Sequence, residues 1–241
     1  MEEVEMVDSG SLSLDAIADN ERVAALTSIV PENGVVLDVG ANRGQFAREL
    51  LSAVTCTVYA FEPVPAAYQD LVALAEEFPS IHPVPYAVSD VEGIADLHVQ
   101  ASDVGSSMLV PLANQSSQWL TPSEVVPVET VRIDRFMTDH SLDHVDLLKS
   151  DAQGFDGRVI SSAGDCLDPD RIGAILVETN FHAFYADQDA FYDVMKSICE
   201  HGYFLAGFFR HYNHSGWLWW ADVLYLPNRA PFSTQFSNSV R

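Results

Sequence analysis

Acidic and polar side chains recur where the apolar runs of this sequence end. They are Asp38 and Asn42 after the first run, Glu62 after the second, Ser89 and Asp90 after the third, Asp151 after the fourth, and Glu178 with His182 after the fifth. Carboxylates beside buried segments are costly unless a cation or a set of hydroxyl groups meets them. The pattern therefore indicates a site for a ligand that carries positive charge, hydroxyl groups or both.

The first of these segments predicts a tight turn against a ligand, because Gly40 and Gly44 let the backbone approach closely. The spacing is GxxxG, whereas a dinucleotide fingerprint has a glycine where Asn42 stands. Asp38, just before the turn, would repel a diphosphate. A zwitterionic sulfonium cofactor fits better, and Glu62, at the end of the next run, is suited to accept both ribose hydroxyls.

Short apolar runs alternate with amphipathic segments, and this order predicts the elements that position the side chains. Strands are expected at 35–39, 56–61, 81–88, 145–149, 172–178, 203–209 and 218–226, and helices at 15–30, 45–53, 66–78, 158–167 and 190–201. The fold class is α/β, an open and mostly parallel sheet that binds ligands at its carboxyl edge. Only residues 210–217 separate the last two strands, so the last strand is expected to run antiparallel.

The alternation also divides the chain. Residues 1–34 are expected to form an acidic segment and a helix, residues 35–228 the main domain, and residues 229–241 an irregular tail. Between about 91 and 134 the alternation breaks. Short alternating pieces at 94–99 and 124–131 predict a small β-rich insertion there rather than a second domain.

The overall charge limits the partners. The 241 residues include 35 acids and 12 bases, a formal net charge of −23. This charge argues against nucleic acid and against an anionic membrane surface as partners. Only two bases are lysines, and we interpret this composition as that of a protein from a halophilic cell with concentrated internal salt. A merely acidic cytosolic protein is the alternative.

The termini and the cysteines indicate a cytoplasmic protein. No secretory signal precedes the first helix, and no apolar stretch is long enough to cross a bilayer. Cys56, Cys166 and Cys199 are odd in number and lack metal-ligand spacing, so all three are expected to be buried, reduced thiols. The sequence leaves the oligomeric state open, a homo-oligomer included.

Five motifs in order resemble those of FkbM-type S-adenosylmethionine (SAM) methyltransferases. They are Asp38–Phe46, Phe61–Pro63, Ala87–Asp90, Gly105–Ser107 and Asp146–Gly154, within a resemblance that covers about residues 35–180. The family implies a class I methyltransferase fold, a Rossmann-like sheet of seven strands. It also implies SAM as the methyl donor and, as partner, a small-molecule or glycan acceptor with a hydroxyl group on a sugar or related natural product.

The resemblance also implies roles for single residues. Asp38, Gly40 and Asn42, with Gly44 in the same turn, would surround the methionine part of SAM. Glu62 would hold the ribose, and Asp90 with Ser89 would bind the adenine amino group. Ser106 and Ser107 would lie over the cofactor or the acceptor, with a flexible turn as the alternative. The sequence departs from the family at Ser150 and Gln153, where a β-branched apolar residue and often Glu are usual. It departs again at Phe155–Gly157. These departures leave the acceptor side less certain than the cofactor side.

Activating an acceptor hydroxyl calls for a general base. Asp151 is the first candidate and His182 the second, while an acid that only positions its ligands and a loop histidine bonded to backbone are the alternatives. Glu178 would bind the acceptor or make a structural hydrogen bond. Lys149 is expected to pair with a carboxylate, and no metal is expected because Asp151, Glu178 and His182 lack compact ligand spacing. A non-catalytic SAM-binding module and an NAD-dependent oxidoreductase remain alternative functions.

Overall fold

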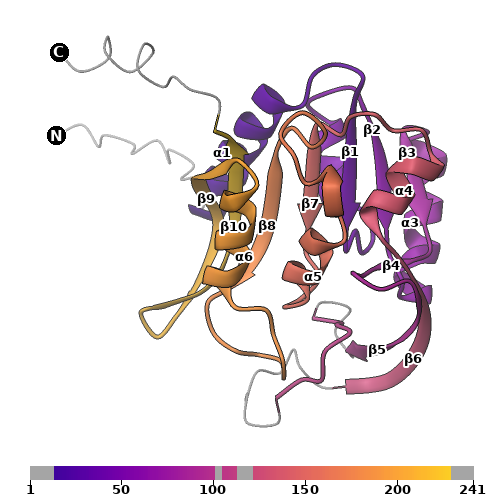
Figure 1. Ribbon diagram of the computed structural model, residues 1–241, viewed down its shortest axis with the longest axis vertical. Coiled ribbons are helices and arrows are strands. Elements are labelled where there is room, and N and C mark those ends of the chain that lie inside the picture. Colours follow the sequence, from indigo (N-terminus) through magenta and orange to yellow (C-terminus); the bar gives the residue numbers. More distant parts are fainter. Residues whose placement is uncertain (1–13, 101–104, 113–121, 229–241) are drawn as a thin grey trace, which may run out of the picture.

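The computed structural model describes residues 14–100, 105–112 and 122–228, and its centre is a seven-stranded sheet (Figure 1). The strands follow the order β3-β2-β1-β7-β8-β10-β9. Their bounds are β1 Gly34–Val39, β2 Cys56–Phe61, β3 Ile81–Val84, β7 Leu147–Ser150, β8 Ile175–Asn180, β9 Tyr203–His214 and β10 Trp217–Pro227. Only β10 pairs antiparallel with its neighbours, which confirms the predicted mostly parallel sheet and its antiparallel last strand.

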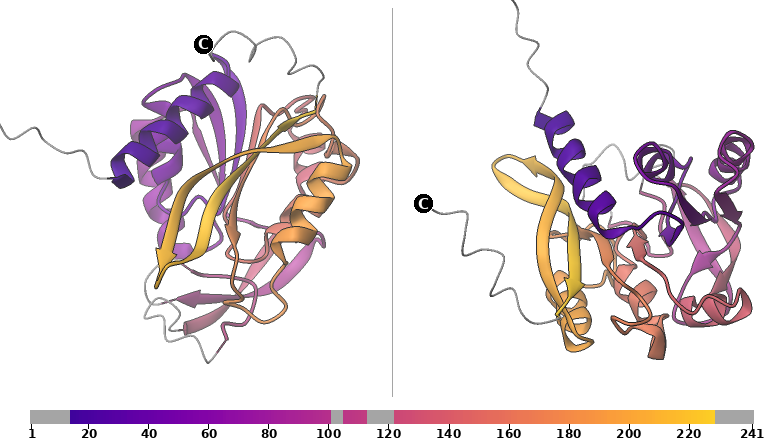
Figure 2. Two further views of the ribbon diagram at one scale, coloured as in Figure 1. Left: turned by 90° about the vertical axis from the view of Figure 1, so that its left-hand side faces the viewer. Right: turned by 90° about the horizontal axis from the view of Figure 1, so that it is seen from above.

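Helices cover both faces of this sheet, as the view from above in Figure 2 shows. One face carries α1 Leu14–Ile29, α2 Gln45–Leu51 and α3 Pro65–Glu77, and the other carries α4 Ile133–Asp139, α5 Asp156–Ser161 and α6 Phe191–Glu200. Strand β1 is buried on both sides, since Val36 packs with the first helix layer and Leu37 with the second. The carboxyl ends of the central strands therefore lie at one edge of a sheet whose two faces are both covered by helices.

The last two strands form a longer hairpin than predicted. The connection was expected over residues 210–217, but β9 continues to His214, and only Ser215 and Gly216 make the turn. Both residues have positive φ, at 52° and 81°, as the tight turns of two-residue hairpins require. Apolar periodicity fades after Phe209, so no pattern in the sequence indicates these extra strand residues.

The predicted strand at 81–88 is wrong as a single element. It is two strands: β3 belongs to the main sheet, and β4 (Ala87–Val88) pairs with β6 (Pro122–Val131) in a second sheet. Pro85 stands between them and has no N–H to continue a ladder. The second sheet, order β4-β6-β5 with β5 at Gly93–Gln100, is the predicted β-rich insertion.

Three smaller predictions also need correction. The helix expected at 158–167 is shorter: α5 ends at Ser161, and a 3-10 turn follows at Gly164–Cys166. Helix α4 was not predicted, and it packs Ile133, Phe136 and Met137 into the core. Cys56 and Cys166 are buried as expected, but Cys199 is exposed because it lies on the outer side of α6.

No helix in the three described ranges is both long and apolar enough to cross a membrane. The tail at 229–241 and most of the acidic N-terminal segment lie outside the described residues.

Candidate active site

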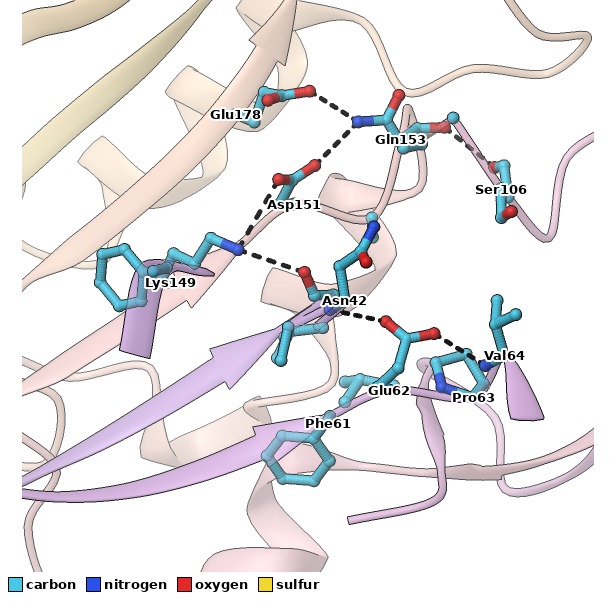
Figure 3. A pocket seen from close by; sticks show the side chains of 18 of the residues that line it. Asn42, Phe61, Glu62, Pro63, Val64, Ser106, Lys149, Asp151, Gln153 and Glu178 are labelled. Atoms are coloured by element: carbon cyan, nitrogen blue, oxygen red, sulfur yellow. Dashed lines mark hydrogen bonds and ion pairs between the residues drawn. The ribbon is translucent and has the colours of Figure 1, made fainter. Parts of the chain in front are cut away.

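A cavity of about 650 Å³ opens at the carboxyl ends of β1, β2, β7 and β8, where parallel sheets bind ligands. Seven of the predicted site residues line it: Gly40, Asn42, Glu62, Ser106, Ser107, Asp151 and Glu178. Five others do not form its wall: Asp38, Gly44, Ser89, Asp90 and His182. Figure 3 shows the strand-end side chains around the opening.

The turn after β1 brings two strand ends into direct contact. Gly40 has φ 72°, and a Cβ atom on it would lie 2.0 Å from the carbonyl oxygen of Asp151. Asn42 follows with φ 49°, also in the left-handed region. Gly44, at the start of α2, has another reason to be glycine, because a Cβ there would meet Leu74 on α3 at 2.4 Å. Gly40 therefore shapes the cavity floor, whereas Gly44 lets two helices pack closely.

Glu62 is held in place by the main chain. Its Oε2 accepts the N–H of Asn42 at 2.8 Å, and its Oε1 accepts the N–H of Val64 at 2.7 Å (Figure 3). Burial raises its pKa from 4.5 to about 7, although these two hydrogen bonds work in the opposite direction. Each carboxylate oxygen keeps a second lone pair, so the group can still accept two ligand hydroxyls.

Lys149 joins the ends of β1 and β7 beneath the cavity. Its Nζ lies 2.9 Å from Asp38 and 3.7 Å from Asp151, and it stands over the ring of Phe46. Burial lowers the pKa of Lys149, but Asp38 and Asp151 more than reverse this effect and leave it above its ordinary value. The predicted pairing of Lys149 with a carboxylate is confirmed. Asp38 itself is fully buried, and the lysine, rather than a ligand, is its partner.

A glutamine connects two carboxylates of the cavity wall, Asp151 and Glu178. The side-chain amide Nε2 of Gln153 donates to Asp151 at 2.8 Å and to Glu178 at 2.7 Å (Figure 3). Burial, with the nearby carboxylate of Asp151, raises the pKa of Glu178 well above its ordinary value. The family's usual Glu at this position would place a third acid here. Gln153 instead satisfies both carboxylates with one neutral group.

Two further residues fix the orientation of this glutamine. Tyr185 donates from its hydroxyl to the carbonyl oxygen of Gly105 at 2.7 Å and to the side-chain oxygen of Gln153 at 3.3 Å. Ser107 donates to the main-chain oxygen of Gln153 at 2.9 Å. The serine motif thus contacts the Asp151–Gly154 loop, whereas Tyr185 had no signal in the sequence beyond its place in an aromatic cluster.

Two positions where the sequence departs from the family, Ser150 and Asp156, flank the loop at residues 151–154 and bind each other. Ser150 donates a hydrogen bond to Asp156, which also accepts the N–H of Ala152 at 2.9 Å and of Gly154 at 3.2 Å. Burial raises the pKa of Asp156 to about 6. Together the serine and the aspartate pin the loop that presents Asp151 and Gln153 to the cavity.

Comparison with known proteins decides the family. A model described as the methyltransferase FkbM domain matches residues 38–205, more than half of the chain. The chain belongs to the FkbM methyltransferase family. SAM is therefore its cofactor. The chain is also similar to a curated relative, the 2-O-methyltransferase NoeI of Sinorhizobium fredii (strain NBRC 101917 / NGR234), with 26% identity over 166 residues. That match spans 65% of each chain, slightly less than two thirds of the relative.

The search of solved structures also found chains that are similar to this FkbM chain. Fibrillarin from Aeropyrum pernix, solved with SAM bound, is 14% identical with a TM-score of 0.48, covering 87% of this chain and 76% of that one. A putative RNA methyltransferase from Pyrococcus horikoshii is 13% identical with a TM-score of 0.49, covering 90% and 85%.

The residues of the FkbM site fit SAM rather than a dinucleotide. Asn42 occupies the position where a pyrophosphate needs glycine, and the wall beside it is acidic, with Glu62, Asp151 and Glu178 facing the space. Such a wall suits a cation bearing ribose hydroxyls and repels a diphosphate. The cavity volume is also within the range of small-molecule and cofactor sites.

The predicted adenine contacts are displaced from the wall. Ala87 and Val88 line the cavity, but Ser89 and Asp90 turn away, and Asp90 accepts a hydrogen bond from Arg132 through its main-chain oxygen. Ala87 and Val88 of β4 are thus the residues of this motif that reach the cavity wall. Recognition of the adenine amino group by Asp90 stays a prediction.

His182 lies just outside the cavity. Its ring is 5.8 Å from that of Trp219, and its main-chain oxygen accepts a hydrogen bond from Gln188. Within the described ranges, no group of three or more His, Cys, Asp or Glu residues could hold a metal ion. Asp151 is thus the predicted base that reaches the cavity wall, and His182 is not on it.

Proposed function

We propose that this chain is a SAM-dependent O-methyltransferase that acts on a hydroxyl group of a sugar, glycan or related natural product. Membership of the FkbM family supports the transfer of a methyl group. The name of the relative NoeI, a 2-O-methyltransferase, supports oxygen as the acceptor atom. The observation that carries the proposal is the pair of carboxylates, Asp151 and Glu178, which Gln153 holds together on the cavity wall.

The cofactor side consists of Gly40, Asn42 and Glu62. The main-chain groups of the turn after β1 bind the methionine part, and Glu62 accepts the ribose hydroxyls through lone pairs that its main-chain contacts leave unused. When bound, SAM supplies an electrophilic methyl group on a good leaving group. The protein then has to align the acceptor oxygen and keep water out of the cavity.

Asp151 is the proposed general base. It lies at the end of the central strand β7, and its second oxygen is 3.7 Å from Lys149, close enough to fix the carboxylate but longer than a direct hydrogen bond. Gln153 holds the other oxygen. Asp151 accepts the hydroxyl proton as the acceptor oxygen attacks, and Glu178 binds the acceptor on the opposite side of Gln153.

Ligand-induced stabilisation tests the cofactor half of the proposal. SAM and its demethylated product should each raise the melting temperature of the protein, and NAD should not. A shift with NAD alone would contradict the assignment of the cavity.

Turnover tests the catalytic half. Incubation of the protein and methyl-labelled SAM with a glycan and metabolite extract should give labelled products that resist base hydrolysis, as ethers do and esters do not. Asp151→Asn should keep SAM affinity within about threefold and lower turnover about 100-fold or more. Asp193→Asn, a change at an exposed acid of α6, is the matched control and should leave turnover unchanged. Full activity of Asp151→Asn would remove it as the base.

A further inference from the structure

The far side of the cavity from Glu62 is aromatic. Phe184 comes from the segment after β8, Tyr212 from β9, and Trp219 and Trp220 from β10, and all four line the space. Tyr212 stacks on Trp220 with ring centroids 6.0 Å apart and an angle of 17°, while Phe184 lies 5.4 Å from Trp219. We refer to these four rings as the aromatic clamp. None of them belongs to the motifs that surround the cofactor.

An irregularity in β10 brings two consecutive tryptophans to one cavity. In a regular strand, neighbouring side chains point to opposite faces. Here Leu218 pairs with Asn213 and Trp220 with Tyr212, so Trp219 has no partner on β9 and forms a β-bulge. The main-chain oxygen of Trp219 accepts the N–H of Phe181 at 2.9 Å, which ties the bulge to the end of β8. Bulges beside active sites re-aim side chains in this way.

An unused hydrogen-bond donor lies next to the clamp. Asn180 is 9% exposed and lines the cavity, and its side-chain nitrogen has no hydrogen-bond partner among the described residues. A buried donor without a partner is costly, and therefore points to a ligand that supplies an acceptor. Asn180 pairs through its backbone with Trp220 and lies two residues after Glu178 on the same strand. The side-chain amide of Asn180, the carboxyl group of Glu178 and the aromatic clamp therefore lie at one corner of the cavity wall.

The charges of the wall disfavour an anionic ligand at this corner. Five acids, Glu49, Glu62, Asp151, Glu178 and Asp222, line the cavity against three bases, Arg22, Lys149 and Arg210. Arg22 is paired with Asp222 at 2.8 Å and with Glu49, and Lys149 is paired with Asp38. Arg210 lies close enough to Asp222 to interact electrostatically. Each of these three bases already faces a carboxylate of the protein, so a ligand phosphate or carboxylate would gain little attraction from the described residues of this corner.

We infer that the aromatic clamp is the acceptor subsite and that it takes an uncharged pyranose ring, whose C–H face stacks on Trp219 and Trp220 while its hydroxyls reach Asn180 and Glu178. Flat apolar rings beside a few polar groups suit a sugar, which has an apolar face and a polar rim. This inference rests on the proposed function for the identity of the reaction, but it makes a separate statement about binding.

Binding without turnover tests the subsite. The full chain, saturated with the demethylated cofactor so that no reaction occurs, is mixed with methyl glucoside, methyl galactoside, methyl mannoside, methyl N-acetylglucosaminide and methyl rhamnoside. Saturation-transfer NMR and quenching of tryptophan fluorescence then measure binding. At least one neutral glycoside should bind, and methyl glucuronide, its anionic counterpart, should bind at least tenfold more weakly than methyl glucoside.

Variants locate the binding. Trp219→Ala should weaken the bound glycoside at least tenfold and leave the affinity for the demethylated cofactor within twofold, and Trp219→Phe should restore most of the glycoside affinity. Trp217→Ala is the matched control, because Trp217 lies on the same strand, is 70% exposed and is not part of the cavity wall. Circular dichroism checks that each variant is folded. Trp219→Leu, which keeps apolar volume but has no aromatic face, should lose glycoside affinity as Trp219→Ala does and keeps the test valid if Trp219→Ala does not fold.

Three results would overturn the inference: no neutral glycoside binds the wild type, glycoside binding is unchanged in Trp219→Ala and Trp219→Leu, or the glucuronide binds as tightly as the glucoside. Stronger binding of a flat heterocycle such as a free nucleobase than of any glycoside would also count against it. Failure of the proposed function looks different, because the glycoside would then bind through Trp219 and yet receive no label from methyl-labelled SAM.

Discussion

The two sides of the cavity are built by different means. On the cofactor side, main-chain groups position the residues. The turn at Gly40 contacts the end of the neighbouring strand, and two main-chain N–H groups donate hydrogen bonds to Glu62. On the acceptor side, side chains hold other side chains: Gln153 joins two carboxylates, Tyr185 orients Gln153, and a bulge aims Trp219. The first arrangement tolerates almost no change at its glycine, whereas the second can be altered one side chain at a time.

The largest expected effect comes from Gly40→Ala on the cofactor side. The new Cβ would lie 2.0 Å from a main-chain oxygen, and the residue would keep a φ of 72°. Strain and overpacking together should lower the free energy of unfolding by about 5 kcal/mol, as measured by chemical denaturation. Gly216→Ala is the control: its φ is 81°, but no atom lies within 4 Å of the added Cβ. Equal losses for the two variants would show that the contact between strand ends is unimportant.

Lys149 connects the two sides, and its removal should have the next largest effect. Lys149→Met leaves Asp38 fully buried without a cation, which should lower the free energy of unfolding by about 4 kcal/mol. The double variant Asp38→Asn with Lys149→Met should recover part of this loss. Lys196→Met, at a residue 70% exposed, should stay within about 0.5 kcal/mol of wild type. A double variant no more stable than the single one would contradict a pairing role.

Glu62 should make the stability of the cofactor-free protein depend on pH. Because its pKa is raised from 4.5 to about 7, the folded protein holds this proton more tightly than the unfolded chain does. Its contribution to the free energy of unfolding is therefore lost as the pH rises from about 4.5 to about 7, by about 3 kcal/mol at most. Denaturation at pH 5 and pH 8 should show a smaller decrease for Glu62→Gln than for wild type. Identical decreases would rule the group out as the source.

The same carboxylate should contribute to cofactor affinity. Glu62→Gln loses hydrogen bonds from ribose hydroxyls to a charged group, which should weaken SAM binding about 10- to 100-fold by calorimetry at pH 8. Glu76→Gln, an exposed change on α3, should have no effect. Unchanged affinity of Glu62→Gln would remove Glu62 from the cofactor site.

The smallest expected effect belongs to Tyr185 on the acceptor side. Tyr185→Phe removes hydrogen bonds to Gly105 and Gln153 and should lower the free energy of unfolding by about 1 kcal/mol. It should lower turnover more than SAM affinity, because it loosens Gln153. Tyr225→Phe is a matched control, since the buried Tyr225 hydroxyl has no hydrogen-bond partner among the described residues. A larger loss for Tyr225→Phe than for Tyr185→Phe would contradict this account.

The sequence predicted the strands and the turn after β1 better than it predicted the contacts between side chains, for a physical reason. Strands β1 and β2, the glycine turn and Glu62 follow from local patterns, because strand periodicity and turn chemistry act over a few residues. The split of 81–88 at Pro85 and the exposed Cys199 depend on packing partners far along the chain. The Ser150–Asp156 pair and the contacts of Gln153 likewise could not be deduced, because nothing in the sequence states which side chains meet.

The bulge at Trp219 makes the acceptor side sensitive to chain length as well as to side-chain chemistry. Deleting one codon there would remove the first of the three register shifts between β10 and β9, with Leu218 and Trp220 as neighbours and a single indole left toward the cavity. If the proposed acceptor subsite is correct, an insertion or deletion of one residue would change the set of rings that meets the acceptor in a single evolutionary step. Relatives that differ by one residue in this hairpin are the place to look for divergent substrate choice.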